Sequence, residues 1–241
     1  MKINILTLFP EMFEPIKNSI IGRAIDNGTI KLNIVNIRDY SLDKHNRVDD
    51  TPFGGGPGMI MQVEPIKKAM EENGFKGLNI YMSPRGKQLN MQLAKDISME
   101  QELTILCGHY EGVDQRALDM FHMEEITIGD YVLTGGELPA MVLIDVVSRF
   151  IEGVLPKEES VNEESIYSGL LEYDQYTKPR EIYGLEVPEV LLNGNHKKIR
   201  LWKFEKALEL TKKKRPDLYE EFIKNPGDLD KDEMKILSKF K

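Results

Sequence analysis

Short apolar runs alternate with helix-like segments over the first 155 residues of the chain. The length and composition of the runs are typical of buried strands, and they lie at 3–8, 32–37, 78–82, 103–107 and 126–128. Between and after them, apolar positions with helical spacing predict helices at 11–26, 65–73, 88–97, 113–122 and 137–150. Strands that alternate with helices predict an α/β fold with a mostly parallel sheet.

The pattern changes after residue 155. Gly153 ends the long apolar helix, and residues 156–168 are acidic, polar and poor in apolar side chains, as in a flexible linker. Beyond it we expect a short helix at 188–192, a basic helix capped by Asn195, and a helix at 231–240. The basic helix carries an apolar stripe of Leu201, Phe204 and Leu208. The sequence therefore predicts an α/β domain at 1–155, a linker at 156–168 and a small helical domain at 169–241.

Three glycine-containing loops follow predicted strands, at 83–86, 108–112 and 128–139. In a parallel sheet such loops gather at one edge, and glycine lets their backbone approach a ligand closely. The acidic side chains among these loops either cap helices or accept hydrogen bonds from an adenosine or amino-acid ligand; they are Glu111, Asp114, Asp130 and Glu137. A further glycine-rich segment, GGGPG at 54–58, is either a tight turn or a contact with ligand or substrate. The pattern predicts a small-molecule site and hence an enzyme.

Other features limit the class of protein. The single cysteine, Cys107, excludes an internal disulfide and a cysteine-rich zinc site, and its place in an apolar run predicts a buried thiol. His45 and His109 lack an HxH or HExxH partner, so no metal site built by the protein is expected. The missing dinucleotide fingerprint disfavours a nicotinamide oxidoreductase. No apolar run approaches membrane-spanning length, so we expect the cytoplasm.

The charge of the chain is uneven. The net charge of −8 argues against a nucleic-acid partner, but residues 196–215 hold nine Lys and Arg residues against two Glu, a local net charge of +7. Taken alone, such a run is better explained by a solvated helix face. Together with the nearby KPR segment at 178–180, it instead predicts contacts with phosphate.

Six segments carry a resemblance that covers essentially the whole chain: VDDTPFGGGPGM, YMSPRG, CGHYEGVDQR, IGDYVLTGGELPA, GLLEYDQYTKP and VLLNGNHKKIR. In this order they resemble the TrmD family of bacterial tRNA (guanine-N1)-methyltransferases. The resemblance implies the SPOUT fold, an α/β domain with a deep C-terminal trefoil knot, followed by a small all-helical domain. It also implies S-adenosylmethionine as cofactor and a homodimer whose active sites are shared between chains. The implied substrate is guanosine 37 in the anticodon stem-loop of tRNA, preceded by another guanosine.

The resemblance also assigns residues. It implies that the cofactor contacts Tyr81, Met82, Ser83, Pro84, Gly86, Gly108, Tyr110, Glu111, Gly112, Ile128, Gly129, Tyr131, Leu133, Gly135, Gly136 and Pro139. It implies that the tRNA contacts Gly54, Gly55, Gly56, Glu172, Lys178, Arg180, Lys197, Lys198 and Arg200.

For catalysis the resemblance implies Arg149 as the cation that stabilises guanine O6, although helical spacing alone favours a pair with Asp145. The family's general base is an aspartate in an EDSF-like pattern, and here the aligned residue of EESI is Glu164, with Glu163 as the alternative. Glutamate can perform the same proton transfer. The family also suggests a magnesium ion, bound weakly through carboxylates and water.

Two further classes of protein remain open from the sequence. One is a SPOUT-type methyltransferase that acts on another RNA position or on a ribose 2′-hydroxyl. The other is a non-catalytic RNA-binding relative, favoured only by the glutamate at position 164.

Overall fold

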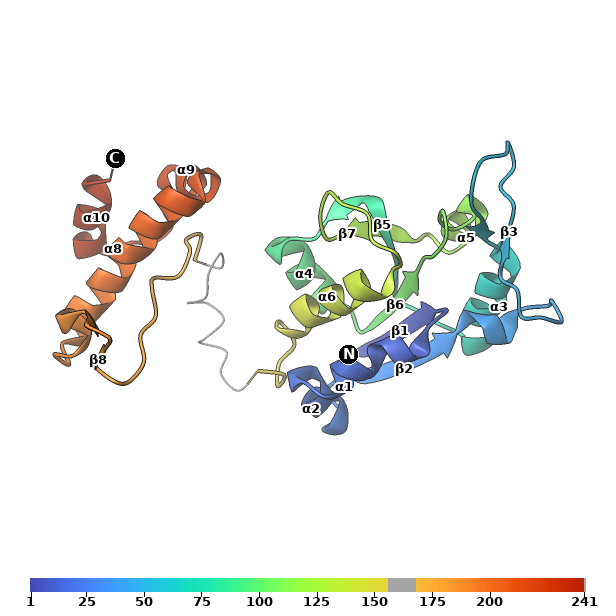
Figure 1. Cartoon of the computed structure of the whole chain (residues 1–241), viewed down its shortest axis with the longest axis horizontal. Helices are drawn as coiled ribbons and strands as arrows, with labels where there is room; N and C mark the ends of the chain where they lie inside the picture. The colour runs from blue at the N-terminus through green and yellow to red at the C-terminus, as the bar shows by residue number, and fades with distance from the viewer. Residues whose placement is uncertain (156–167, 241) are drawn as a thin grey trace. The chain divides into compact units, whose positions relative to one another are not determined.

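The computed structural model describes residues 1–155 and 168–240 (Figure 1). The chain divides into two compact units, Met1–Pro156 and Lys157–Lys241. The acidic segment at 156–167, which contains Glu163 and Glu164, lies outside the described residues.

The first unit is built on a parallel sheet of five strands, visible at the centre of the α/β part in Figure 1. The strand order is β2-β1-β6-β5-β7. The strands are β1 (Lys2–Thr7), β2 (Lys31–Asn36), β5 (Leu78–Gln88), β6 (Glu102–Cys107) and β7 (Glu124–Thr127). All neighbouring strands of this sheet pair in parallel, so their carboxyl ends share one edge. The predicted α/β class is confirmed.

Helices cover both faces of the sheet. Alternate residues of β6 point to opposite faces, so that Ile105 packs in one hydrophobic cluster and Leu106 in the other. The first cluster takes in α1 (Glu14–Lys17), α2 (Ile20–Asp26), α4 (Met91–Ser98) and α6 (Glu137–Ser148). The second takes in α3 (Val63–Asn73) and α5 (Gln115–Met120). The return of α6 to the first face after β7 is consistent with the SPOUT type of fold.

The helix expected at 11–26 is wrong as a single element. The segment forms the 3₁₀ turn η1 (Pro10–Phe13), α1 and α2. The Ser19 side chain accepts a hydrogen bond from the Ile21 N–H at 3.2 Å and so starts a new helix. A Cβ on Gly22 would lie 1.9 Å from the Lys17 carbonyl oxygen, so only glycine permits this close turn between the two helices.

The strand expected at 78–82 continues as β5 to Gln88. Met82 and Lys87 both pair with Ile126 of β7, so residues 83–86 bulge out of a strand that resumes beyond them. A second 3₁₀ turn, η2 (Ile37–Tyr40), follows β2. A small antiparallel pair of strands, β3 (Asp49–Asp50) and β4 (Ile60–Met61), frames the GGGPG segment.

The second unit packs three helices around its own core: α8 (His196–Lys214), α9 (Pro216–Lys224) and α10 (Lys231–Ser238). Asn195 caps α8 as expected, because its Oδ1 accepts a hydrogen bond from the Lys198 N–H at 3.1 Å. The expected stripe is also confirmed, with Leu208 buried and Leu201 and Phe204 packed against the cluster.

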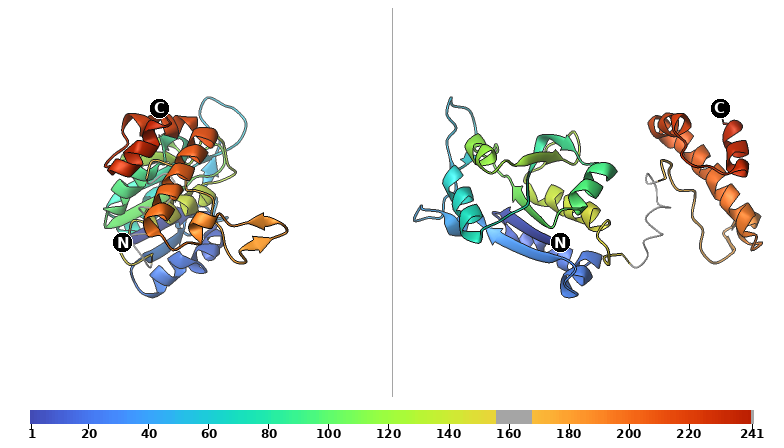
Figure 2. Two further views of the ribbon diagram at one scale, coloured as in Figure 1. Left: turned by 90° about the vertical axis from the view of Figure 1, so that its left-hand side faces the viewer. Right: turned by 180° about the vertical axis from the view of Figure 1, so that it is seen from behind.

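The second unit also contains elements that the sequence did not predict as such. The expected helix at 188–192 is the 3₁₀ turn η3 (Glu189–Leu191). A hairpin of β8 (Glu181–Ile182) and β9 (Leu185–Glu186) precedes it and projects from the helices of its unit (Figure 2). Among the described residues, no helix is both long and apolar enough to span a membrane.

Candidate functional site

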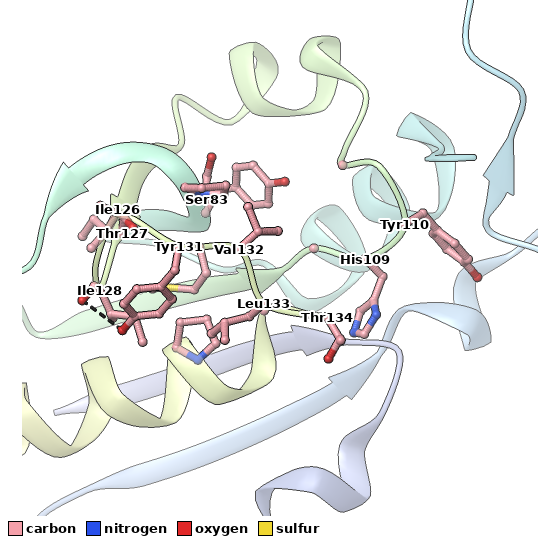
Figure 3. A pocket seen from close by; sticks show the side chains of 18 of the residues that line it. Ser83, His109, Tyr110, Ile126, Thr127, Ile128, Tyr131, Val132, Leu133 and Thr134 are labelled. Carbon is pink, nitrogen blue, oxygen red and sulfur yellow. Dashed lines mark hydrogen bonds between the residues drawn. The ribbon is translucent and has the colours of Figure 1, made fainter. Parts of the chain in front are cut away.

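A cavity of about 190 Å³ opens at the carboxyl edge of the sheet, where the loops after β5, β6 and β7 meet (Figure 3). Its walls are Tyr81 to Pro84, Gly108 to Gly112, Ile126 to Ile128, Tyr131 to Gly136, and Pro139. The loop after β7 lies across the opening with its side chains largely in solvent, and Val132 is 82% exposed. A site at this edge matches the place where parallel α/β sheets bind ligands.

Glycine is required where these loops touch the sheet. A Cβ on Gly136 would lie 2.6 Å from Cys107 Cα and 2.7 Å from the Gly108 nitrogen, both backbone atoms. A Cβ on Gly108 would lie 2.7 Å from the Tyr81 ring. The Gly136 N–H donates to the Gly108 carbonyl oxygen at 2.9 Å. The loops after β6 and β7 are therefore in backbone contact at the floor of the cavity.

The residues to which the resemblance assigned the cofactor mostly line this cavity, with the exceptions of Gly86 and Gly129. Gly86 is needed for strand pairing, because a Cβ there would lie 2.3 Å from the backbone of Glu125 and Ile126. Gly129 faces the Tyr131 ring, 2.4 Å from an added Cβ. Both glycines shape the walls without lining the space between them.

The cavity also includes residues that the resemblance did not individually assign to the cofactor: His109, Ile126, Thr127, Val132 and Thr134. His109, Val132 and Thr134 fall within the loops that the sequence placed at the site, whereas Ile126 and Thr127 belong to β7. His109 had been considered only as a metal ligand, and its neighbours in space come from distant parts of the chain.

Glu137 is a buried carboxylate at the start of α6, 1% exposed. Its Oε1 accepts a hydrogen bond from the Thr7 hydroxyl at 2.6 Å, and its Oε2 lies 2.7 Å from His109 Nε2. The Thr7 oxygen in turn accepts from the Phe9 N–H at 2.9 Å. Glu137 had been expected to cap a helix or to accept from a ligand, but both of its oxygens are engaged by side chains of the protein.

Burial also controls two titratable groups at the carboxyl edge of the sheet, Cys107 at the end of β6 and Tyr81 of β5. Desolvation raises the pKa of the Cys107 thiol well above its ordinary value, and the negative charge of Glu137 adds to the effect. The thiol is fully buried and neutral, as the sequence predicted. Desolvation likewise raises the pKa of the Tyr81 hydroxyl.

The GGGPG segment forms an exposed loop between β3 and β4. Gly54, Gly55 and Gly56 have φ values of 87°, 79° and 124°, with no neighbour within 4 Å of an added Cβ. Here glycine serves the backbone conformation rather than close packing. Gly58 does meet a neighbour, since its Cβ would lie 2.3 Å from Glu111 Cγ. The loop therefore reaches the rim of the cavity.

Arg149, to which the resemblance assigned the stabilising cation, lies at the opposite end of α6 from the cavity. Arg149 is partly buried at the C-terminal cap of α6. The helix rise of about 1.5 Å per residue separates it by about 15 Å from Pro139, the nearest cavity-lining residue of α6. Glu172 belongs to the second unit and is partly buried. Glu164 and Glu163 lie outside the described residues.

The basic side chains to which the resemblance assigned tRNA contacts are exposed, but two of them are paired. Lys197 Nζ lies 2.6 Å from Asp232 Oδ2, and Arg200 forms ion pairs with Asp230 and Glu233. Lys178, Arg180 and Lys198 are exposed, and the described part of the chain contains no ion pair for them. The local charge of +7 is thus partly neutralised by α10.

No group of three or more His, Cys, Asp or Glu side chains within residues 1–155 and 168–240 is arranged to hold a metal ion.

Comparison with known proteins identifies the family. The model of the family tRNA (Guanine-1)-methyltransferase TrmD matches residues 1–221. A tRNA (guanine-N(1)-)-methyltransferase of Clostridium perfringens (strain 13 / Type A) is 52% identical over 241 residues, covering 98% of this chain and 99% of the relative. The enzyme of the same name from Alkaliphilus oremlandii is 54% identical, and the match covers 92% of this chain and 94% of the relative. The one from Clostridium botulinum (strain Hall) is 50% identical, and the match covers 100% of this chain and 98% of the relative. The chain therefore belongs to the TrmD family of tRNA (guanine-1)-methyltransferases.

Proposed function

We propose that the chain transfers the methyl group of S-adenosylmethionine to N1 of guanosine 37 in tRNA, next to the anticodon, in the cytoplasm. The observation that carries the proposal is the cavity at the carboxyl edge of the sheet. It is lined by the glycine loops at which the family resemblance puts the cofactor, in a chain that matches the family over residues 1–221.

The walls of the cavity suit the cofactor chemically. When bound, S-adenosylmethionine supplies an electrophilic methyl group on a cationic sulfur. Ile126, Ile128, Leu133 and Pro139 offer apolar surface for an adenine ring, and the loop backbones offer hydrogen-bonding groups. The Glu111 carboxylate at the rim provides negative charge for a cation.

The reaction requires a base and a cation. N1 of guanine carries a proton that must leave before N1 can attack a methyl group, and the resulting negative charge spreads onto O6. We assign the proton acceptor to Glu164, with Glu163 as the alternative, and the stabilising cation to Arg149. Glu172 is the second acid at the target base.

The separation of Arg149 from the cavity of its own chain supports a homodimer with shared sites. The guanidinium would have to span about 15 Å along α6 to Pro139, the nearest cavity-lining residue of that helix, which is farther than an arginine side chain extends. A second copy of the chain would supply it instead. Exposed apolar side chains near the start of α6, Val132, Leu138 and Val142, offer surface for such an interface.

The second unit is proposed to bind the anticodon stem-loop. Lys178, Arg180 and Lys198 are available to phosphates, whereas Lys197 and Arg200 would exchange their carboxylate partners for phosphate. Magnesium is included in the proposal as an assisting ion bound through carboxylates and water. The described residues offer no three-ligand cluster, so no step of the reaction is assigned to the metal.

The test is incorporation of labelled methyl from S-adenosylmethionine into unmodified tRNA transcripts with guanosines at 36 and 37, beside a transcript with adenosine at 37. Label in the first transcript alone supports the proposal. Equal label in both means another RNA position is the target, as in the SPOUT-type alternative. Cofactor binding without any transfer supports the non-catalytic, RNA-binding alternative.

A further inference from the structure

Glu137 is a buried carboxylate that the proposed methyl transfer does not use. It connects the ends of three strands: Thr7 ends β1, His109 follows β6, and Glu137 itself follows the loop after β7. Because a carboxylate only accepts hydrogen bonds, His109 donates through Nε2–H. Glu137 thus holds the side chains of Thr7 and His109, which are 130 and 28 positions away from it in the sequence.

Stability alone does not explain this arrangement. Taking a carboxylate out of water carries a large desolvation cost, and well-packed apolar residues often replace buried polar pairs without loss of stability. Both hydrophobic clusters of the first unit are formed by other residues. Glu137 lies in the chain between the cavity-lining residues Gly136 and Pro139 and is hydrogen-bonded to a third, His109, which indicates a role in the geometry of that cavity.

His109 transmits this geometry to the cavity wall. It is the neighbour of Tyr110, a non-glycine residue at φ 59°, and of Glu111 at the rim. The His109 ring is packed edge-on against Phe9, with centroids 4.8 Å apart. On its other side it meets Gly135, where an added Cβ would lie 2.3 Å from His109 Cε1. Figure 3 shows His109 beside Thr134, where the loops after β6 and β7 approach each other.

We propose that Glu137 is a positioning residue for S-adenosylmethionine: through His109 it fixes the 108–112 loop in the conformation that binds the cofactor. The inference rests on the proposed cofactor site. Glu137 touches neither cofactor nor tRNA. A hydrogen bond in which one group is a buried carboxylate has the strength to change cofactor affinity by about tenfold or more.

The test compares cofactor affinity, measured by titration calorimetry with S-adenosylmethionine, in four variants. They are Glu137→Gln, His109→Ala, their double variant and His109→Gln, which keeps a side-chain N–H donor. We expect each of the first two to weaken binding about tenfold and to raise the cofactor KM, with kcat at saturating cofactor changed less than threefold. The double variant should be no weaker than either single variant, because the two residues act as one unit. His109→Gln should restore most of the affinity.

A matched control separates positioning from stability. Ile30→Val shortens a core side chain that is 1% exposed and precedes β2, the edge strand far from β7. It should lower the Tm and leave cofactor affinity unchanged. Parental affinity in His109→Ala would overturn the inference, and so would a hundredfold loss in the double variant. If Glu137→Gln does not fold, the two His109 variants decide the matter. Failure of the parental protein to bind the cofactor would instead refute the proposed function.

Discussion

Arg149 provides a sharp test of how the catalytic site is assembled. About 15 Å of helix separates it from Pro139, the nearest residue of α6 that lines the cavity of its own chain, so we predict that it acts on the cofactor bound to the partner chain. In Arg149→Ala, the negative charge on guanine O6 loses its cation. Removing such a stabilising group costs a factor of about 10² to 10³ in kcat.

A heterodimer of two inactive chains distinguishes action within one chain from action across the dimer. One chain carries Arg149→Ala and an intact cavity, and the other carries a cavity blocked by Gly136→Val and an intact Arg149. If Arg149 acts on the partner's cavity, one of the two sites of this symmetric dimer is complete. The heterodimer should then recover roughly half of the parental methyl-transfer rate.

The assay uses chains with two different affinity tags, co-expressed and purified in sequence, and measures methyl transfer to a tRNA transcript. Both variant homodimers should be inactive. The control heterodimer pairs the unaltered chain with one that carries both substitutions, and it should be inactive too, because its intact cavity faces the missing Arg149. An inactive test heterodimer with a half-active control would show that Arg149 acts within its own chain and would refute the reasoning.

Three further predictions follow from single residues. Gly136→Ala should lower the Tm by a few degrees and weaken cofactor binding in calorimetry, because the added Cβ would lie 2.6 Å from the backbone of Cys107. The control is Gly74→Ala, at φ 60° with open space around it, which should lower the Tm but leave cofactor binding unchanged. Glu164→Gln should abolish methyl transfer while cofactor binding persists; if Glu163→Gln has that effect instead, the base is one residue earlier. Backbone hydrogen bonds in the first turn of α10, and then Arg200, lower the pKa of Asp230 from 3.8 to about 2. The stabilising contribution of the ionised Asp230 is therefore complete above about pH 4 and is lost as the pH falls through about 2. Circular dichroism should show this loss as part of the acid unfolding transition. The same transition, unchanged in Asp230→Asn, would contradict the prediction.

The parallel sheet could be predicted because its strands are short, mostly apolar runs, of which 103–107 is an example. The glycine loops followed from the same order of elements. The division of the helix at 11–26 could not be predicted from periodicity, since it depends on the contact of Gly22 with the Lys17 carbonyl. Nor could the continuation of β5 beyond residue 86, because it depends on pairing with a strand about 40 positions later.

Electrostatic environment was the least predictable property. From the sequence, Glu137 was expected to cap a helix or to accept a hydrogen bond from a ligand. In the structure its partner Thr7 lies 130 positions away and the pair is buried. Arg200 was expected to contact phosphate, yet its guanidinium forms ion pairs with Asp230 and Glu233 at the start of α10. Both outcomes depend on tertiary contacts that leave no local pattern in the sequence. The roles of Arg149 and Glu164 came from family resemblance alone, since neither spacing nor composition distinguishes them.

The most direct test of the central claim is the identity of the methylated nucleoside. A transcript with guanosines at 36 and 37 is incubated with the protein and S-adenosylmethionine, digested to nucleosides and analysed by mass spectrometry against standards, with nuclease fragments to locate the modification. The account predicts one 1-methylguanosine per tRNA, in the fragment that contains position 37. A 2′-O-methylated nucleoside, or 1-methylguanosine in another fragment, would contradict it.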